Sequence, residues 1–311
     1  MSFSAETKNE LCRLEGEDAS RDKAECYGIF LFAKSFMPEN ICMTTENGLA
    51  AHRAAELAAR TAGVVTEITS VLTRRRGANT YTLSVQGEDQ RRRFLAFFGH
   101  TGRELNLRIN RENLGDPPSL APFLRGVFLS CGTVTDPQKD YHLEMIVPYM
   151  KLARDLITLL EEAGELSVQP SLVNRKGSFV VYVKGSEQIA DFLTYIGAKN
   201  SSMELMQVKM LKQMRNDINR KTNFETANLG KTADAAARQI AAIEAIDKKV
   251  GLHSLPEDLR ELASLRRENP EMSLRELGAG LSEPISRSGV NHRLQRILEF
   301  AQALGVPGQE E

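Results

Sequence analysis

An internal duplication in the first two-thirds of the sequence is the feature that most restricts its fold. Five glycines recur in the same order, and the offsets between the copies are 98, 101, 100, 98 and 98 residues in chain order. The pairs are Gly28 and Gly126, Gly63 and Gly164, Gly77 and Gly177, Gly87 and Gly185, and Gly99 and Gly197. An ordered set of matches at a nearly constant offset predicts two copies of one structural unit.

Hydrophobic periodicity predicts the same order of elements in both copies. In the second copy we expect, in chain order, a helix over 122–131, a strand over 141–147, a helix over 149–162, a hairpin of strands 166–173 and 178–183, and a helix over 186–197. In the first copy we expect a helix over 49–62, strands over 64–72 and 81–86, and a helix over 88–98. The first hairpin of this copy looks shortened, because only 41–45 has a strand-like pattern.

Each copy also contains an apolar helix that carries one of the paired glycines, Gly28 in the first and Gly126 in the second. Glycine has no Cβ, so two helix backbones approach closely where glycines face each other. We therefore expect the two helices to meet at a pseudo-twofold axis.

Composition limits the class of protein. A chain of 311 residues with 41% apolar residues suits two domains, and a formal charge of -1 means that any attraction to nucleic acid comes from local patches. Cys12, Cys26, Cys42 and Cys131 lack CxxC spacing, which argues against a zinc site or a disulfide framework. We expect no metal, no cofactor and no small-molecule substrate. The sequence shows no signal peptide and no membrane-length apolar run, so we expect a cytoplasmic protein.

The C-terminal region has the pattern of a helix-turn-helix. An alanine-rich helix over 232–246 and a helix that starts at Pro256 precede Ser273 and Glu276, which have the spacing of a capping box. A break near Pro284 separates this short helix from a second one that Ser286 caps. We expect a set of DNA-contacting donors around the two helices: Ser273, Arg275, Ser286, Arg287, Ser288, Asn291, His292, Arg293 and Arg296.

Further basic residues are candidates for contacts to DNA phosphates. They lie at the two equivalent hairpin turns and on a basic helical stretch: Arg74, Arg75, Arg76, Arg175, Lys176, Lys212, Arg215, Arg220 and Lys221. The expected organisation is an N-terminal segment (1–20), a duplicated scaffold (21–205, with halves 21–115 and 118–205), a basic helical linker (206–231), a helix-turn-helix domain (232–304) and a tail (305–311).

The two apolar helices, with the residues that follow them, resemble the motif of LAGLIDADG homing endonucleases over 26–36 and 124–134. The stretches 131–137, 141–144, 219–223 and 286–294 are similar to the WhiA family of bacterial DNA-binding regulators. This resemblance implies an α+β fold, in which a duplicated LAGLIDADG-like domain with pseudo-twofold αβ repeats precedes an all-α helix-turn-helix domain. It also implies roles in cell division, chromosome segregation and, in sporulating relatives, development.

The resemblance places the two catalytic acids of the nucleases at Ala33 and Cys131. Neither side chain holds magnesium, which needs oxygen ligands, and Lys34 would repel a cation. Asp136, Asp140 and Glu144 are the nearby acids, without a symmetric set in the first half except Glu39 and Glu46. We therefore expect no catalytic residues and no nuclease activity.

The leading hypothesis is a sequence-specific transcriptional regulator that binds double-stranded DNA, associates with the nucleoid, and contacts other transcription proteins. Two alternatives remain open at this point. One is a scaffold that reaches the nucleoid through protein contacts and does not regulate specific sequences. The other is an active homing endonuclease, which Ala33 and Cys131 disfavour.

Overall fold

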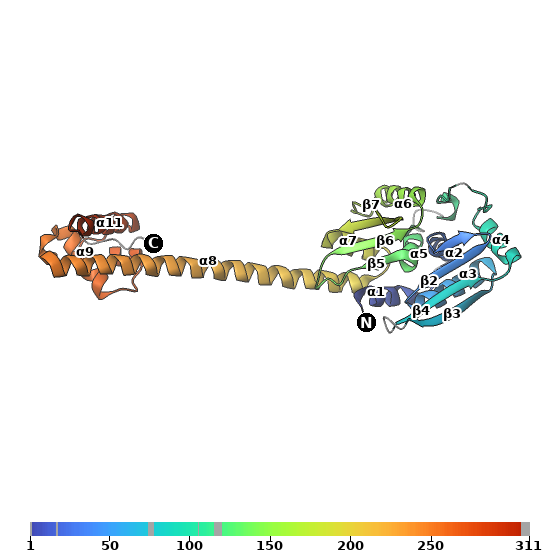
Figure 1. Cartoon of the computed structure of the whole chain (residues 1–311), viewed down its shortest axis with the longest axis horizontal. Helices are drawn as coiled ribbons and strands as arrows, with labels where there is room; N and C mark the ends of the chain where they lie inside the picture. Colours follow the sequence, from blue (N-terminus) through green and yellow to red (C-terminus); the bar gives the residue numbers. More distant parts are fainter. Residues whose placement is uncertain (1, 17, 74–77, 105, 115–119, 306–311) are drawn as a thin grey trace. The chain divides into compact units, whose positions relative to one another are not determined.

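The structure, a computed structural model, describes residues 2–16, 18–73, 78–104, 106–114 and 120–305. The chain divides into two compact units, Met1–Gln213 (unit 1) and Met214–Glu311 (unit 2). Unit 1 contains helices and two antiparallel sheets, whereas the described residues of unit 2 are helical, as Figure 1 shows. The predicted fold class, a duplicated α+β domain followed by a helical domain, is confirmed.

The two sheets of unit 1 repeat one topology. The first contains β1 (Ser35–Met37), β2 (Asn40–Thr45), β3 (Thr66–Thr73) and β4 (Ala78–Val85) in the order β1-β2-β4-β3. The second contains β5 (Gly132–Val134), β6 (His142–Val147), β7 (Ser171–Arg175) and β8 (Ser178–Lys184) in the order β5-β6-β8-β7. All neighbouring strands are antiparallel, so the duplication in the sequence is a duplication in the fold.

Helices α2 (Ala19–Leu31) and α5 (Leu120–Cys131) pack together between the two halves. A Cβ on Gly28 would lie 2.2 Å from the carbonyl oxygen of Phe123, and one on Gly126 would lie 2.2 Å from that of Glu25. Only glycine permits this approach, and the predicted contact between the two helices is confirmed. The remaining helices of the repeats are α3 (Gly48–Ala62), α4 (Glu88–Phe97), α6 (Met150–Glu162) and α7 (Ser186–Tyr195).

A single apolar core runs through both halves of unit 1. Phe30 and Phe94 from the first half belong to the same buried cluster as Phe128 and Phe192 from the second. Because the two repeats share one core, we expect them to fold as one body rather than as two independent domains.

Three features of unit 1 differ from the sequence-based expectation. Helix α1 (Phe3–Cys12) was not predicted. The first hairpin is not shortened, because β1 and β2 match β5 and β6, and the second copy instead has the longer connection. Strand β7 begins at Ser171, so 166–170 is not part of a strand. A turn at Lys176 and Gly177, which both have a positive φ, joins β7 to β8.

Helix α8 (Lys199–Val250) is continuous over 52 residues. It joins the two predicted helical segments, 206–220 and 232–246, because the residues between them include neither proline nor a strong helix breaker except Gly230. Among the described residues, no helix is long and apolar enough to cross a membrane.

Unit 2 packs α9 (Glu257–Glu268), α10 (Leu274–Ala279) and α11 (Arg287–Ala303) on the C-terminal part of α8, after a short 3₁₀ turn, η3 (Leu252–Ser254). Its core includes Ile243 and Ile246 of α8, Leu262 of α9, Leu277 of α10 and Leu294 of α11. This core holds the short helix α10 and the longer helix α11 in place.

Candidate nucleic-acid interface

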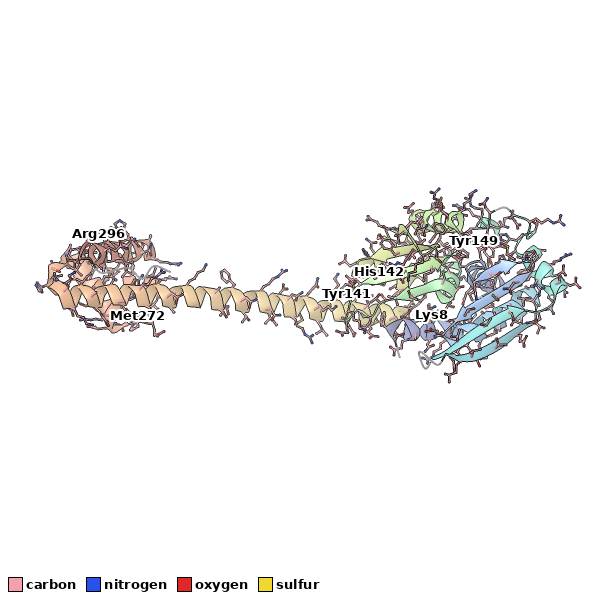
Figure 2. The ribbon with its side chains drawn as sticks, viewed as in Figure 1. Lys8, Tyr141, His142, Tyr149, Met272 and Arg296 are labelled. Carbon is pink, nitrogen blue, oxygen red and sulfur yellow. The ribbon has the colours of Figure 1, made fainter. Side chains whose placement is uncertain are left out.

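The C-terminal ends of α2 and α5 open onto a pocket of about 670 Å³ in unit 1. Ala33 and Cys131, the residues expected at the positions of the nuclease acids, both line it. Lys8 of α1, labelled in Figure 2, also lines the pocket, and its ammonium donates a hydrogen bond of 3.1 Å to the carbonyl oxygen of Leu129. The unpredicted helix α1 thus places a cation at the carbonyl end of α5, where the helix dipole favours positive charge.

The described lining of this pocket contains one acid, Glu46, and two lysines, Lys8 and Lys34, so it lacks the paired carboxylates that a catalytic divalent cation needs. Burial lowers the pKa of Lys8 to about 8, which leaves it mostly protonated at neutral pH, and burial raises the pKa of Cys131 to about 12, which keeps its thiol neutral. Of the acids predicted nearby, Glu144 pairs with His142 and Arg175, and Asp136 accepts a hydrogen bond from the backbone of its own turn. Within the described residues, no group of three His, Cys, Asp or Glu side chains is arranged to hold a metal ion.

In unit 2, local interactions fix the turn between α10 and α11. Ser273 and Glu276 form the predicted capping box at the start of α10. The amide of Ile285 donates to the carbonyl oxygen of Gly278 at 3.0 Å, and a Cβ on Gly278 would lie 2.4 Å from the carbonyl oxygen of Ile285. Glu261 of α9 accepts hydrogen bonds from the amide and hydroxyl of Ser282. These contacts set the turn between the two helices.

Helix α11 has one buried face and one polar face. Val290, Leu294 and Ile297 are buried. The exposed candidates at its N-terminal part are Arg287, Ser288, Asn291 and His292, with Arg296 one turn further on. Among the described residues, Arg287, Asn291 and His292 make no hydrogen bond or ion pair. Their donors and acceptors are therefore available to a ligand.

Other candidates in unit 2 already have partners within it. The hydroxyl of Ser273 caps α10, and that of Ser286 caps α11 by accepting from the amide of Gly289 at 3.2 Å. Arg293 is half-buried and pairs with Asp258. Arg275 is exposed on α10.

Sequence reasoning missed one polar residue on the outer face of α11. Gln295 is exposed and lies one helical turn after Asn291 and His292. The i, i+4 spacing from Asn291 was a signal that would have identified it.

The candidate phosphate contacts have different surroundings. Lys212 donates to the carbonyl oxygen of Pro137 at 2.8 Å and lies over the ring of Tyr141. Arg175 pairs with Glu144 at 3.4 Å, and Lys176 is exposed at the adjoining turn. The exposed members of the set on α8 are Arg215, Arg220 and Lys221. Arg74, Arg75 and Arg76 lie outside the described residues.

Comparison with known proteins gives consistent matches along the chain. Residues 120–215 match the family model described as the WhiA LAGLIDADG-like domain, and residues 218–301 match that of the WhiA C-terminal HTH domain. The probable cell division protein WhiA of Clostridium novyi is 36% identical, with 99% of this chain and 100% of that protein covered. That of Ruminiclostridium cellulolyticum is 37% identical, with 98% of each covered.

One solved structure is similar over nearly the whole chain. The crystal structure of full-length DUF199/WhiA from Thermatoga maritima has a TM-score of 0.60 and 26% sequence identity, with 97% of this chain and 99% of that chain covered.

Proposed function

Because this chain belongs to the WhiA family, we propose that it is a sequence-specific DNA-binding regulator of transcription that reads double-stranded DNA with helix α11. The observation that carries this proposal is the unpartnered polar face at the N-terminal part of α11. A short helix, a turn and a second helix with such a face is the arrangement that enters the major groove.

The residue types on this face suit specific tasks. Arg287 has the donors for the O6 and N7 atoms of guanine, and the amide of Asn291 matches the N6 and N7 atoms of adenine. Ser288, His292 and Gln295 are further base or phosphate contacts. Arg275 and the hydroxyls of Ser273 and Ser286 lie around the start of the two helices and suit phosphates, which fix the position of a protein on the duplex without reading its sequence.

Unit 1 is proposed to serve as a scaffold without nuclease activity. Cleavage of DNA by this fold needs oxygen ligands for a divalent cation, and the two relevant positions carry a methyl group at Ala33 and a neutral thiol at Cys131. The ammonium of Lys8 adds a positive charge to the same pocket. Glu46 is the one acid among the described lining residues, so a divalent cation at this place would find a single carboxylate beside the ammonium of Lys8.

The basic candidates outside α11 are proposed as salt-sensitive phosphate contacts. Arg215, Arg220 and Lys221 are the best placed, because they are exposed on α8 and have no partner among the described residues. Lys212 and Arg175 would first have to leave Pro137 and Glu144.

Because the relatives are probable cell division proteins, we propose the same process for this chain. We place it in the cytoplasm on the nucleoid, where it would act with other transcription proteins. Chromosome segregation, and sporulation in relatives, would follow from the genes that it controls.

Selection of binding sites from random duplex DNA tests the proposal. Wild-type protein should enrich a defined sequence motif, and the Arg287→Ala/Asn291→Ala variant should lose it. Gln302→Ala, an exposed change near the C-terminal end of α11, is the matched control and should keep the motif. Weak, salt-sensitive binding without any motif would instead favour the nucleoid scaffold. Magnesium-dependent cleavage of plasmid DNA by the wild type would contradict the absence of nuclease activity.

A further inference from the structure

Two arginines of α11 share one carboxylate from the neighbouring helix α9. The Oδ2 atom of Asp258 lies 3.2 Å from Nη1 of Arg296 and 3.7 Å from Nε of Arg293. Arg293 also donates from Nη1 to the carbonyl oxygen of Asp258 at 3.4 Å. Asp258 lies in the first turn of α9, where the helix dipole stabilises its negative charge.

The donors of α11 are therefore divided into two groups. Arg287, Asn291 and His292, here called the open donors, have no partner among the described residues. Arg293 and Arg296, here called the tethered arginines, are three residues apart and turn toward α9; Figure 2 labels Arg296. The tethered arginines lie on the flank of the helix rather than at its N-terminal part.

The chemistry of the tether resembles that of a DNA phosphate. A guanidinium binds a carboxylate and a phosphate with the same donors, so Asp258 competes with the DNA backbone for both arginines. Contacts to phosphates strengthen binding to every DNA sequence, because the backbone is the same throughout. Holding two arginines back thus weakens binding to random DNA and to a matched sequence by similar factors, and it lowers the salt dependence of both.

We propose that Asp258 withholds Arg293 and Arg296 from the phosphate backbone and thereby sets the overall affinity of α11 for DNA and its dependence on salt. This inference rests on the proposed function, because it assumes that α11 binds DNA. Asp258 acts through the arginines and is not itself a base contact.

The test compares the full-length wild type with Asp258→Asn on random duplex DNA and on the selected motif, at several salt concentrations. Two released arginines would steepen the plot of log affinity against log salt concentration by up to about 1.8, or about 0.9 for each new phosphate contact. Over a fourfold rise in salt, the affinity of the variant for random DNA would then fall by a factor of about 12 more than that of the wild type. At low salt the affinity for both DNAs should rise by similar factors, so the preference for the motif should stay close to that of the wild type.

Glu257→Gln is the matched control. It removes one negative charge from the same turn of the same helix, but Glu257 is exposed and has no partner among the described residues. Its salt dependence should stay close to that of the wild type. Adding Arg293→Ala and Arg296→Ala to Asp258→Asn should restore the wild-type slope.

Equal slopes for Asp258→Asn and Glu257→Gln would overturn the inference, as would weaker binding of Asp258→Asn to both DNAs. If Arg287→Ala/Asn291→Ala still loses the motif in either case, the proposed function stands and only this inference fails. A wild type without DNA affinity would remove both.

Discussion

The carboxylate of Glu25 and the guanidinium of Arg53 form a bidentate ion pair inside unit 1, with Nη2 of Arg53 at 2.9 Å from Oε2 of Glu25 and Nε at 2.5 Å from Oε1. Arg125 of α5 adds a third bond to the same carboxylate, at 3.1 Å, and donates to the carbonyl oxygen of Ile196. All three charged side chains are buried. One carboxylate of the first repeat thus connects α2, α3 and α5 next to the point where the two repeats meet.

Glu25→Gln should strongly destabilise unit 1. The substitution leaves the guanidinium groups of Arg53 and Arg125 buried without a counter-charge, and breaking a buried pair from one side costs about 3–5 kcal/mol. Differential scanning calorimetry of the full chain measures this as a lower transition temperature of unit 1. The control Glu56→Gln removes an exposed partner of Arg60 and should change the free energy of unfolding by less than about 1 kcal/mol. Similar losses from both variants would contradict the role of burial.

Gly28→Ala and Gly126→Ala should each destabilise unit 1 or prevent its folding. A methyl group at either position would lie 2.2 Å from a backbone carbonyl oxygen of the opposite helix, so α2 and α5 would have to separate. Overpacking of this kind typically costs about 1–3 kcal/mol or more. Urea unfolding followed by far-ultraviolet circular dichroism gives the change.

Gly230→Ala on α8 is the control for these two substitutions. Nothing lies within 4 Å of a Cβ at this position, and alanine has a higher helix propensity than glycine. This variant should be as stable as the wild type or more stable, by up to about 1 kcal/mol. A loss of stability in Gly230→Ala would show that the helix environment, rather than the close approach, explains the effect at Gly28 and Gly126.

The close approach of α2 and α5 was predictable because it depends on residue identity alone: only glycine fits, and the glycines recur at a fixed offset. Helix α1 was not predictable in the same way. Its few buried residues, Phe3, Thr7 and Leu11, can be recognised as a buried face only when the surface that they pack against is known. For the same reason the sequence did not reveal that Lys8 enters the pocket beside Cys131.

The candidate site in unit 2 shows the same limit. The capping residues Ser273 and Ser286 act through local spacing, so the sequence identified them. Helical periodicity also separated the buried face of α11 from the polar one. It did not show that Asp258, 35 residues before Arg293, would bind two of the polar side chains, because that contact depends on how α9 packs on α11.

Lys8 should make the stability of unit 1 depend on pH. Its pKa is lowered from 10.5 to about 8 by burial, so between these values the folded state binds fewer protons than the unfolded state. Stability from this group should therefore rise as the pH increases from about 8 toward 10.5. The thiols of Cys12, Cys26 and Cys131 act in the opposite direction above pH 9, because desolvation raises their pKa to about 12.

The Lys8→Met variant separates the lysine from these thiols. Thermal unfolding of both proteins between pH 7 and 9 should show a gain with pH in the wild type that is absent from the variant. Parallel curves would mean that the ammonium of Lys8 is solvated in the folded state, and that it does not occupy the pocket at the ends of α2 and α5.

Two cap substitutions separate folding from DNA binding in unit 2. Ser273→Ala and Ser286→Ala each remove a side-chain oxygen that accepts a hydrogen bond from a backbone amide at the start of a helix. Such a loss typically lowers the free energy of unfolding by about 1 kcal/mol. The hydroxyl of Ser288 accepts no hydrogen bond from a backbone amide, so unit 2 should keep nearly its full stability in Ser288→Ala.

If α11 is the reading helix, Ser288→Ala should lower DNA affinity without a change in the unfolding temperature. The two cap variants should lower both, and part of the loss of affinity should persist when unit 2 refolds at lower temperature, because the proposed phosphate contacts of the two hydroxyls are missing. A cap variant that regains wild-type DNA affinity once it is folded would instead assign its hydroxyl to the helix cap alone.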